Sequence, residues 1–362
     1  MAQQTIIPFG PQHPVLPEPV HLDLVLEDET VVNAIPQIGF VHRGLEKLVE
    51  TRDYQRYVFV AERVCGICSF GHSCGYSQAV EQLMDIEVPR RAQYLRVIWH
   101  ELSRIHSHLL WLGLAADAMG FESLFMHSWR LRERVLDIFE KTTGGRVILS
   151  VCTPGGVFKD IEDTELKAIV GVLAGLRDEY DQIAATFLED GSVRNRLSGV
   201  GILTPEMARE YSCVGPFARA SGLAMDVRLS GEGAYGELID FEPVTATEGD
   251  CYARCKVRIQ EVRQSIDIIN EMVSRIPDGD IRTPVKGNPA DGAEGVTRVE
   301  QPRGEAFYYV RGNGSKYLER FRVRTPTSAN IPGMVGAIAG CDLADVPNII
   351  LTIDPCISCS ER

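Results

Sequence analysis

Two cysteine pairs with the same spacing stand at opposite ends of the chain: Cys65 with Cys68, and Cys356 with Cys359. Structural zinc ribbons usually pair such motifs across about 15 to 20 residues. Here 287 residues lie between Cys68 and Cys356. If the fold brings the two pairs together, four soft thiolates form one closed metal pocket. The spacing alone leaves three interpretations open, namely a structural zinc, another thiolate-bound metal, and an uncoupled or redox-active pair.

The composition is that of a globular protein with a sizeable core, since 44% of the 362 residues are hydrophobic. The formal charge of −13 argues against nucleic acid as a partner, because phosphates require a basic surface. Ten cysteines, several of them in a metal motif, indicate thiols that are kept reduced in a cytoplasmic setting. The six outside the two pairs are interpreted as buried small hydrophobes: Cys74, Cys152, Cys213, Cys251, Cys255 and Cys341.

No segment has the composition of a signal peptide or a membrane span. The first ten residues contain neither a basic region nor an apolar stretch of signal-peptide length. The most apolar helical segment, 109–120, is shorter than the roughly 18 to 20 residues that cross a membrane, and it contains Asp117. We therefore expect any membrane association to come from partner subunits.

Apolar periodicity predicts a mainly helical protein with small β ribbons, of the α+β class. Apolar residues from Ile98 to Leu112 recur every three or four positions, which predicts a long buried helix. The same pattern predicts helices near 131–141, 165–188 and 251–276. Thr204 followed by Pro205 predicts the N-cap and first turn of another helix, running to about 211.

Two β hairpins are expected in addition. The first joins 21–26 to 31–38 through an acidic turn and follows a proline-rich loop at 8–19. The second joins 306–310 to 317–323 around Gly312-Asn313-Gly314. We expect one domain over 1–362, with a long core helix bundle and with the N- and C-terminal segments meeting at the metal site.

The residues around the two cysteine pairs narrow the choice of metal. The first pair stands in Glu62-Arg63-Val64-Cys65-Gly66-Ile67-Cys68-Ser69-Phe70-Gly71-His72, and the second in Asp354-Pro355-Cys356-Ile357-Ser358-Cys359-Ser360-Glu361-Arg362. These segments closely resemble the two signature segments of nickel-iron hydrogenase large subunits. Further landmarks of the resemblance are Gly10-Pro11-Gln12-His13-Pro14, His42-Arg43-Gly44-Leu45-Glu46-Lys47, Gln301-Pro302-Arg303-Gly304-Glu305 and Arg324-Thr325-Pro326-Thr327. The short length and the first landmark are similar to membrane-associated, energy-converting hydrogenases of the Ech type.

The resemblance implies a nickel-iron centre with cyanide and carbon monoxide ligands on iron. All four cysteines would bind nickel, and Cys68 and Cys359 would also bridge to iron. Cys65 and Cys356 would be terminal ligands, and the thiolate of Cys356 would take up the proton. Nickel bound by four thiolates is electron-rich, as hydrogen chemistry requires.

The family's other site residues match five positions of this chain. Glu18 matches the glutamate that relays the proton, with a solvated loop carboxylate as the alternative. Arg303 matches an arginine above the open metal face, with a surface salt bridge as the alternative. Thr327 matches a hydroxyl that donates to a cyanide ligand, and Asp354 an acid next to the metal ligands, with ordinary hairpin or turn roles as the alternative for both. His72 matches a ring that donates to a cysteine sulfur, with a core histidine as the alternative.

Glu46 matches a glutamate that holds an additional magnesium or iron ion in relatives. The last residue of those relatives is a histidine ligand, whereas Arg362 stands here and is a poor ligand. An ion pair between the two side chains is therefore the alternative to this additional ion.

The resemblance also implies partners. Outside the two pairs the cysteines lack cluster-type spacing, so electrons are expected to pass through an iron-sulfur small subunit. Ferredoxin or a ferredoxin-like subunit is the expected electron carrier, and integral membrane subunits would translocate ions, with this chain on the cytoplasmic side of the membrane. No nucleotide cofactor is expected, because the GxGxxG match at 231–236 is not followed by a helical pattern.

A quinone-binding subunit of respiratory complex I shares the Gly-Pro-Gln-His-Pro loop and the His-Arg-Gly-x-Glu-Lys segment. In a metal-free protein of that kind, His13 would help to hold the quinone head group. The complete cysteine quartet favours the hydrogenase, because the resemblance to the quinone-binding protein does not include it.

Overall fold

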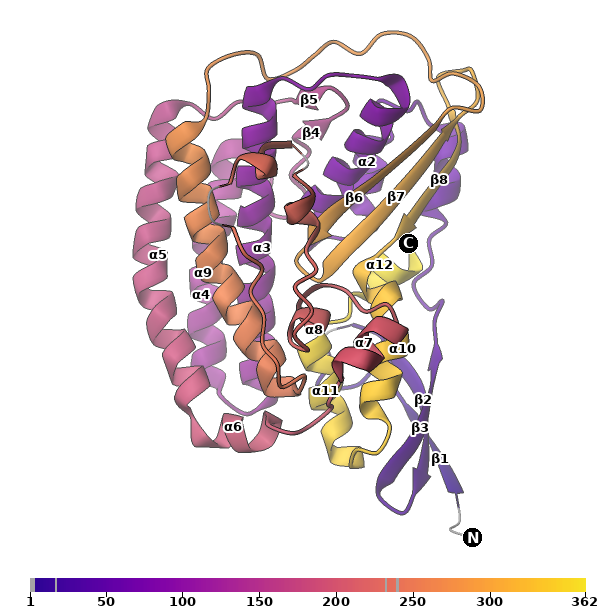
Figure 1. Cartoon of the computed structure of the whole chain (residues 1–362), viewed down its shortest axis with the longest axis vertical. Helices are drawn as coiled ribbons and strands as arrows, with labels where there is room; N and C mark the ends of the chain where they lie inside the picture. The colour runs from indigo at the N-terminus through magenta and orange to yellow at the C-terminus, as the bar shows by residue number, and fades with distance from the viewer. Residues whose placement is uncertain (1–3, 17, 232, 239–240) are drawn as a thin grey trace.

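The computed structural model describes residues 4–16, 18–231, 233–238 and 241–362. Its elements confirm an α+β protein dominated by helices. Figure 1 shows a bundle of long helices along one side, a three-stranded sheet along the other, and the yellow C-terminal helices near the centre. A second three-stranded sheet projects at the lower right of this view.

The helix bundle consists of α3 (Arg90–Ala118), α4 (Glu122–Thr143), α5 (Asp163–Glu189) and α9 (Cys251–Arg275). Both α3 and α5 contact α4 and α9. The predicted stripe lies on α3, but this helix is buried on almost all sides, including Arg104 and His108. Helix α4 begins at Glu122, well before the predicted 131, because its first turns are mostly exposed or half-buried and its stripe of buried apolar residues starts only at Leu131.

A central sheet packs beside the bundle. Strands β6 (Glu294–Gln301), β7 (Gly304–Gly312) and β8 (Leu318–Arg324) pair antiparallel in that order. Helix α2 (Ser69–Met84) crosses β6 and β7. The predicted hairpin is confirmed as β7 and β8, whereas β6 is an addition to it.

The N-terminal sheet contains the other predicted hairpin, as β2 (His21–Glu27) and β3 (Thr30–Gln37). Strand β1 (Gln4–Phe9) was not expected and pairs with β2 at the edge of the sheet. Only Phe9 of β1 is buried, so the strand lacks the alternation that marks a half-buried strand.

The remaining elements are short. Thr204 caps α7 as predicted, because its Oγ1 accepts the Met207 N–H at 3.2 Å. The remaining short elements of the described residues are η1 (Leu45–Thr51), α1 (Val58–Ala61), η2 (Glu62–Val64), β4 (Cys152–Thr153), β5 (Gly156–Val157), α6 (Gly191–Leu197), α7 (Pro205–Glu210), α8 (Gly215–Arg219), η3 (Val227–Ser230), η4 (Gly233–Glu237), α10 (Pro326–Ile338), η5 (Leu343–Asp345), α11 (Val346–Ile353) and α12 (Ile357–Glu361).

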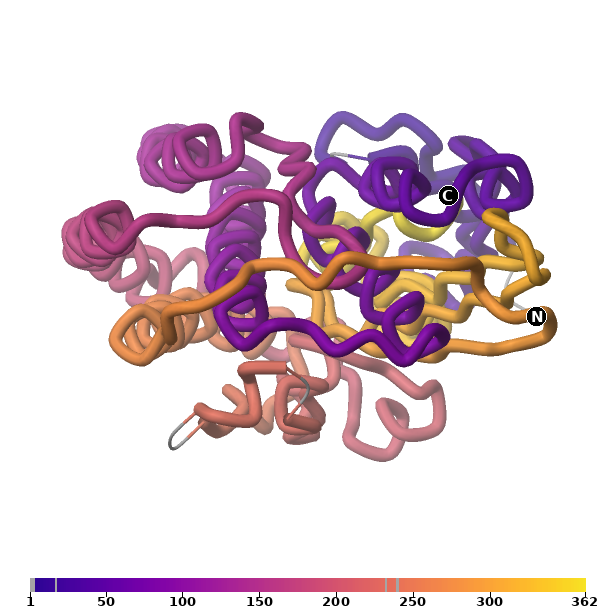
Figure 2. The backbone as a smooth tube through the Cα atoms, turned by 90° about the horizontal axis from the view of Figure 1, so that it is seen from above, coloured from indigo at the N-terminus to yellow at the C-terminus, as the bar shows by residue number. Residues whose placement is uncertain are grey.

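The C-terminal segment lies against the first part of the chain. Figure 2 shows the C-terminus among the indigo coils of the N-terminal quarter. Arg43 donates to the carbonyl of Ser358 at 2.9 Å, and the carboxylate of Glu361 accepts the Gly39 N–H at 2.7 Å. Within the described ranges, no helix is both long enough and apolar enough to cross a membrane.

Candidate metal centre

The four paired cysteines meet in one buried pocket. Cys65 follows η2 and Cys68 precedes α2, whereas Cys356 precedes α12 and Cys359 lies within it. The Sγ atoms of Cys65 and Cys356 are 3.3 Å apart, and those of Cys65, Cys68 and Cys359 lie within 4.8 Å of one another. All four are free thiols, and none is more than 3% exposed. The fold thus brings both pairs together, as the sequence predicted.

This donor set fits a soft metal cation. Hydrogen bonds from neighbouring cysteines hold the pKa of the Cys65 thiol well below its ordinary value. Burial, together with the same neighbours, raises the pKa of Cys359 well above it. The bare pocket therefore favours a single thiolate, because several buried negative charges repel one another. A cation would remove this repulsion, and thiolate sulfur suits soft transition metals.

Arg303 reaches the pocket from the turn between β6 and β7. Its Nη1 lies 3.5 Å from Cys68 Sγ and donates to Ser107 Oγ at 3.1 Å, and its Nη2 donates to Asp354 Oδ1 at 2.8 Å. Burial opposes its charge, but Asp354 and the cysteines raise the pKa of Arg303 well above its ordinary value. At 5% exposure, Arg303 is not part of a surface salt bridge. A fixed cation thus lies beside the sulfur atoms.

His72 of α2 also contacts the thiol pocket. Its Nε2 is 3.3 Å from Cys359 Sγ, and its Nδ1 is 2.9 Å from the Tyr308 hydroxyl on β7. Burial lowers the pKa of His72 to about 4, so the ring is neutral near pH 7. With Tyr308 as donor to Nδ1, the remaining ring N–H points to the sulfur. His72 therefore lies within hydrogen-bond distance of Cys359, and its role in tuning the thiolates stays a prediction.

Glu18 and Thr327 contact the backbone of the second cysteine pair. A carboxylate oxygen of Glu18 accepts the N–H groups of Ile357 and Ser358, the latter at 3.2 Å, and Thr327 Oγ1 accepts the Cys356 N–H at 2.9 Å. Burial raises the pKa of Glu18, and the charge of Cys65 adds to that effect, while Arg303 and the two N–H groups oppose it. Glu18 is thus a half-buried acid that is held against the backbone of the second cysteine pair, and not a solvated loop carboxylate.

Glu46 is engaged by arginines. Its carboxylate accepts from Arg322, from the Val323 N–H at 2.9 Å and from Arg362 Nε at 3.0 Å. Despite burial, these donors lower the pKa of Glu46. The Glu46–Arg362 ion pair considered from the sequence is therefore present, and the additional magnesium or iron ion stays a prediction.

Several residues that support the pocket were not identified from the sequence. Arg43 donates to the carbonyls of Arg63, Val64 and Ser358, each at 2.9 Å, and so joins the two cysteine segments. Gln301 Nε2 donates to the Tyr308 hydroxyl at 2.8 Å, and Ser107 contacts Arg303. Arg43 and Gln301 fall in motifs that carry the resemblance, but nothing in the sequence marks Ser107 on its helix.

Other motifs do not form sites in the described residues. Residues 233–236 of the GxGxxG match lie in the short 3-10 helix η4, and residue 232 lies outside the described ranges. His106 and His108 are buried in the bundle, where His108 Nε2 lies 2.8 Å from Glu261 Oε2 and His106 contacts Arg132. Both histidines are therefore packing residues of the helix bundle.

Comparison with known proteins gives two matching families. The model described as "Respiratory-chain NADH dehydrogenase, 49 Kd subunit" matches residues 118–290 and 284–362, and "Nickel-dependent hydrogenase" matches 43–115. Membrane-bound hydrogenase subunit alpha of Pyrococcus furiosus is 40% identical, over 98% of this chain and 87% of that protein. A subunit of the F(420)H(2) dehydrogenase of Methanosarcina mazei is 37% identical, over 100% of this chain and 98% of that protein.

A solved structure has the same fold. It is a chain of the membrane-bound sulfane sulfur reductase, an archaeal respiratory membrane complex, with a TM-score of 0.93 and 31% identity over 99% of this chain and 98% of that one. Fold and similarity together define an oxidoreductase subunit with a buried cysteine cluster that suits a metal. The chain belongs to the family that unites nickel-dependent hydrogenases with the 49 kDa subunit of respiratory-chain NADH dehydrogenase.

Proposed function

We propose that the chain is the catalytic large subunit of an energy-converting nickel-iron hydrogenase, which forms or oxidises hydrogen. One observation carries the proposal: four buried thiols from the two ends of the chain lie in contact. Quinone binding does not require four buried cysteines, and burying them as thiolates without a metal is unfavourable.

The four cysteines would hold a nickel-iron centre with cyanide and carbon monoxide ligands on iron, which supplies the redox chemistry of hydrogen. Arg303 holds a positive charge beside Cys68, and Asp354 fixes the guanidinium. The thiolate of Cys356 takes up the proton, and Glu18 relays it outward as a half-buried acid with a raised pKa. His72 and Thr327 position the sulfur atoms and the backbone around them.

Electron transfer requires partners, because the described residues contain no second cysteine cluster that could hold a metal. An iron-sulfur small subunit would connect the site to ferredoxin or a ferredoxin-like subunit. The relatives that are parts of membrane complexes support integral membrane, ion-translocating partners, with this chain bound peripherally on the cytoplasmic side.

The second candidate is a metal-free quinone-binding subunit of a complex I-like enzyme. The match of 118–362 to the 49 kDa subunit model favours it. The rings of His13 and Phe9 stack at 4.3 Å between centroids, so the histidine of the shared loop is held by packing. This candidate requires no metal in the cysteine pocket.

Metal analysis of the anaerobically purified native complex separates these functions. Nickel and iron in equal amounts, after subtraction of iron-sulfur iron, are expected for the hydrogenase. Zinc alone would make the pocket a structural clasp, and absence of metal would favour quinone binding.

Cys356→Ser should abolish hydrogen turnover and lower the nickel content, because a soft ligand becomes a hard hydroxyl. The matched control is Cys341→Ser, which changes a half-buried cysteine outside the quartet. Normal turnover in the Cys356 variant would remove the pocket from the mechanism.

A further inference from the structure

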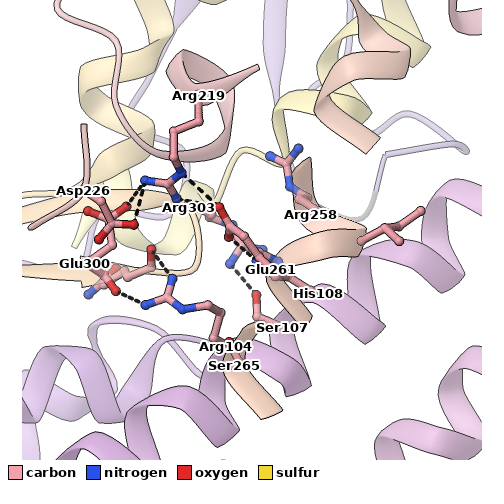
Figure 3. A network of polar contacts seen from close by, with 12 residues as sticks. Arg104, Ser107, His108, Arg219, Asp226, Arg258, Glu261, Ser265, Glu300 and Arg303 are labelled. Carbon is pink, nitrogen blue, oxygen red and sulfur yellow. Dashed lines mark hydrogen bonds and ion pairs between the residues drawn. The ribbon is translucent and has the colours of Figure 1, made fainter. Parts of the chain in front are cut away.

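A cluster of charged side chains, separate from the cysteine pocket, converges on Arg219 of α8 (Figure 3). Arg219 donates to Glu261 of α9 at 2.8 Å and to Glu300 of β6 at 2.7 Å, and lies 3.3 Å from Asp226. All four side chains are at most 1% exposed. The mechanism proposed above uses none of these groups.

The cluster adjoins the cysteine pocket at two places. Ser107, which contacts Arg303, is followed on α3 by His108, which contacts Glu261. Strand β6 ends just after Glu300 and leads directly into the turn that carries Arg303. Glu300 therefore lies close to the cysteine pocket, because short segments of chain connect the two.

Glu300 has the fewest hydrogen-bond donors among the acids of this cluster. Direct contacts join three guanidiniums to four carboxyl groups: Arg104, Arg219 and Arg228 to Glu101, Asp226, Glu261 and Glu300. The next guanidiniums, Arg258 and Arg303, interact most strongly with Asp354.

Glu261 accepts twice from Arg219 and contacts His108, and Asp226 accepts twice from the Arg228 side chain. Among the described residues, Glu300 accepts only one guanidinium N–H and the Val227 N–H at 3.1 Å. Protonation of Glu300 would therefore break fewer hydrogen bonds than protonation of the other acids. It would also remove one negative charge from a cluster in which the carboxyl groups outnumber the guanidiniums.

Glu300 also lines a cavity of about 50 Å³, which has room for a few water molecules beside its polar groups. His100 lines the same cavity, and its buried Nε2 has no hydrogen-bond partner among the described residues. Arg298 and Gly233 belong to the lining and are exposed, so the cavity reaches the surface. Water in this cavity would connect the carboxyl group to solvent.

The environment of Glu300 favours its neutral form. Burial and repulsion by Asp226 raise the pKa of Glu300 to about 7, against the attraction of Arg219, Arg104 and Arg228. Across the cavity it faces His100 and Arg96 of α3, Cys74 of α2, Tyr235 of η4 and Arg298 of its own strand. Glu305 of β7 shares an adjoining groove. Burial lowers the pKa of His100 to about 3, so this ring stays neutral.

We propose that Glu300 is a proton-loading residue that exchanges its proton with solvent through the His100 cavity. In the loading step, one proton passes from solvent to a carboxylate oxygen, an O–H bond forms, and the side chain becomes a neutral carboxyl. No electron and no other bond changes. The residue does not touch the cysteines and is distinct from the relay assigned to Glu18.

Infrared spectroscopy of the native complex tests this protonation directly. In the wild type, the carbonyl band of a protonated, buried carboxyl should titrate near neutral pH and shift in D2O. Glu300→Gln should remove that band, whereas Glu305→Gln, which changes a half-buried acid on β7, should leave it. His100→Phe should slow the D2O shift at least severalfold without removing the band.

Each result decides the proposal. A wild type with no titrating carboxyl band, or a band that survives Glu300→Gln, would overturn proton loading at Glu300. An unchanged exchange rate in His100→Phe would overturn the route through the cavity. The wild-type titration gives a decision even where a variant does not fold, and none of these readouts depends on hydrogen turnover or on a loaded metal site.

Discussion

At the residue scale, Glu18 is the acceptor that we propose for a proton leaving Cys356. It is half-buried, its pKa is raised, and it accepts hydrogen bonds from the backbone of the second cysteine pair. Glutamine preserves the size of the side chain and one acceptor oxygen but cannot carry the proton. Glu18→Gln should therefore leave the metal content intact and lower hydrogen turnover by roughly 10²–10⁴-fold, the usual contribution of a positioned acid or base.

Glu29→Gln is the control for this variant, because Glu29 is exposed in the turn between β2 and β3. Hydrogen evolution and metal content are measured on the same preparations. A turnover rate in Glu18→Gln equal to that of the control would assign the relay to another residue.

Glu300 gives a prediction about stability. Its pKa is raised from 4.5 to about 7 in the folded protein. Folding therefore favours the proton on Glu300, so the stabilisation is complete below about pH 4.5 and is lost as the pH rises through about 7. Glutamine resembles the neutral acid at every pH. The free energy of unfolding of Glu300→Gln should therefore rise relative to that of the wild type as the pH increases from about 4.5 to about 7. Denaturant unfolding at several pH values measures the difference, and parallel pH profiles would contradict the assignment.

Individual site residues could be predicted only where they belong to a specific sequence motif. The four cysteines, Arg303 and His72 were found because their motifs are specific. Glu300 was not found, because one glutamate in an alternating strand resembles any exposed strand carboxylate. Its charge partner, Arg219, comes from a distant segment.

At the element scale, the turn between β6 and β7 positions Arg303 only if Gly304 lacks a side chain. Gly304 has φ of +125°, and a Cβ atom there would lie 2.6 Å from the backbone nitrogen of Gly215, at the start of α8. Gly304→Ala should destabilise the protein by about 1–3 kcal/mol through backbone strain, and should also displace Arg303 and lower turnover. Denaturant unfolding and a hydrogen assay measure the two effects.

The control is Gly171→Ala on the exposed face of α5, where a Cβ atom would meet no other group within 4 Å. This change should stabilise the helix by about 0.5–1 kcal/mol. Equal stability of the two variants would show that β7 and α8 do not need their close approach.

Most long elements could be predicted, because helices α3, α5 and α9 have enough turns for an apolar stripe to be seen. The edge strand β1 could not, since it pairs through its backbone and buries one side chain. Short elements such as α8 and α12 are stabilised by tertiary contacts, and their few residues give no periodic signal.

At the scale of the whole molecule, Arg43 connects segments that are far apart in the chain. Its guanidinium donates to carbonyls next to both cysteine pairs, those of Val64 and Ser358. Arg43→Ala should therefore loosen both segments together and raise hydrogen exchange in 63–68 and 356–361 roughly tenfold, equivalent to about 1.4 kcal/mol. Arg52→Ala, at an exposed position, is the control. Faster exchange in one segment alone would mean that the two halves open independently.

The meeting of the two cysteine pairs has a consequence for how the protein is made. A ribosome completes Cys65 and Cys68 first, and the 287 residues between the pairs must follow before Cys356 is added. Throughout that time the nascent chain carries half of a binding site, with thiols open to oxidation or to capture of an unsuitable ion. Loading of the pocket is thus confined to the period after synthesis of its last cysteine.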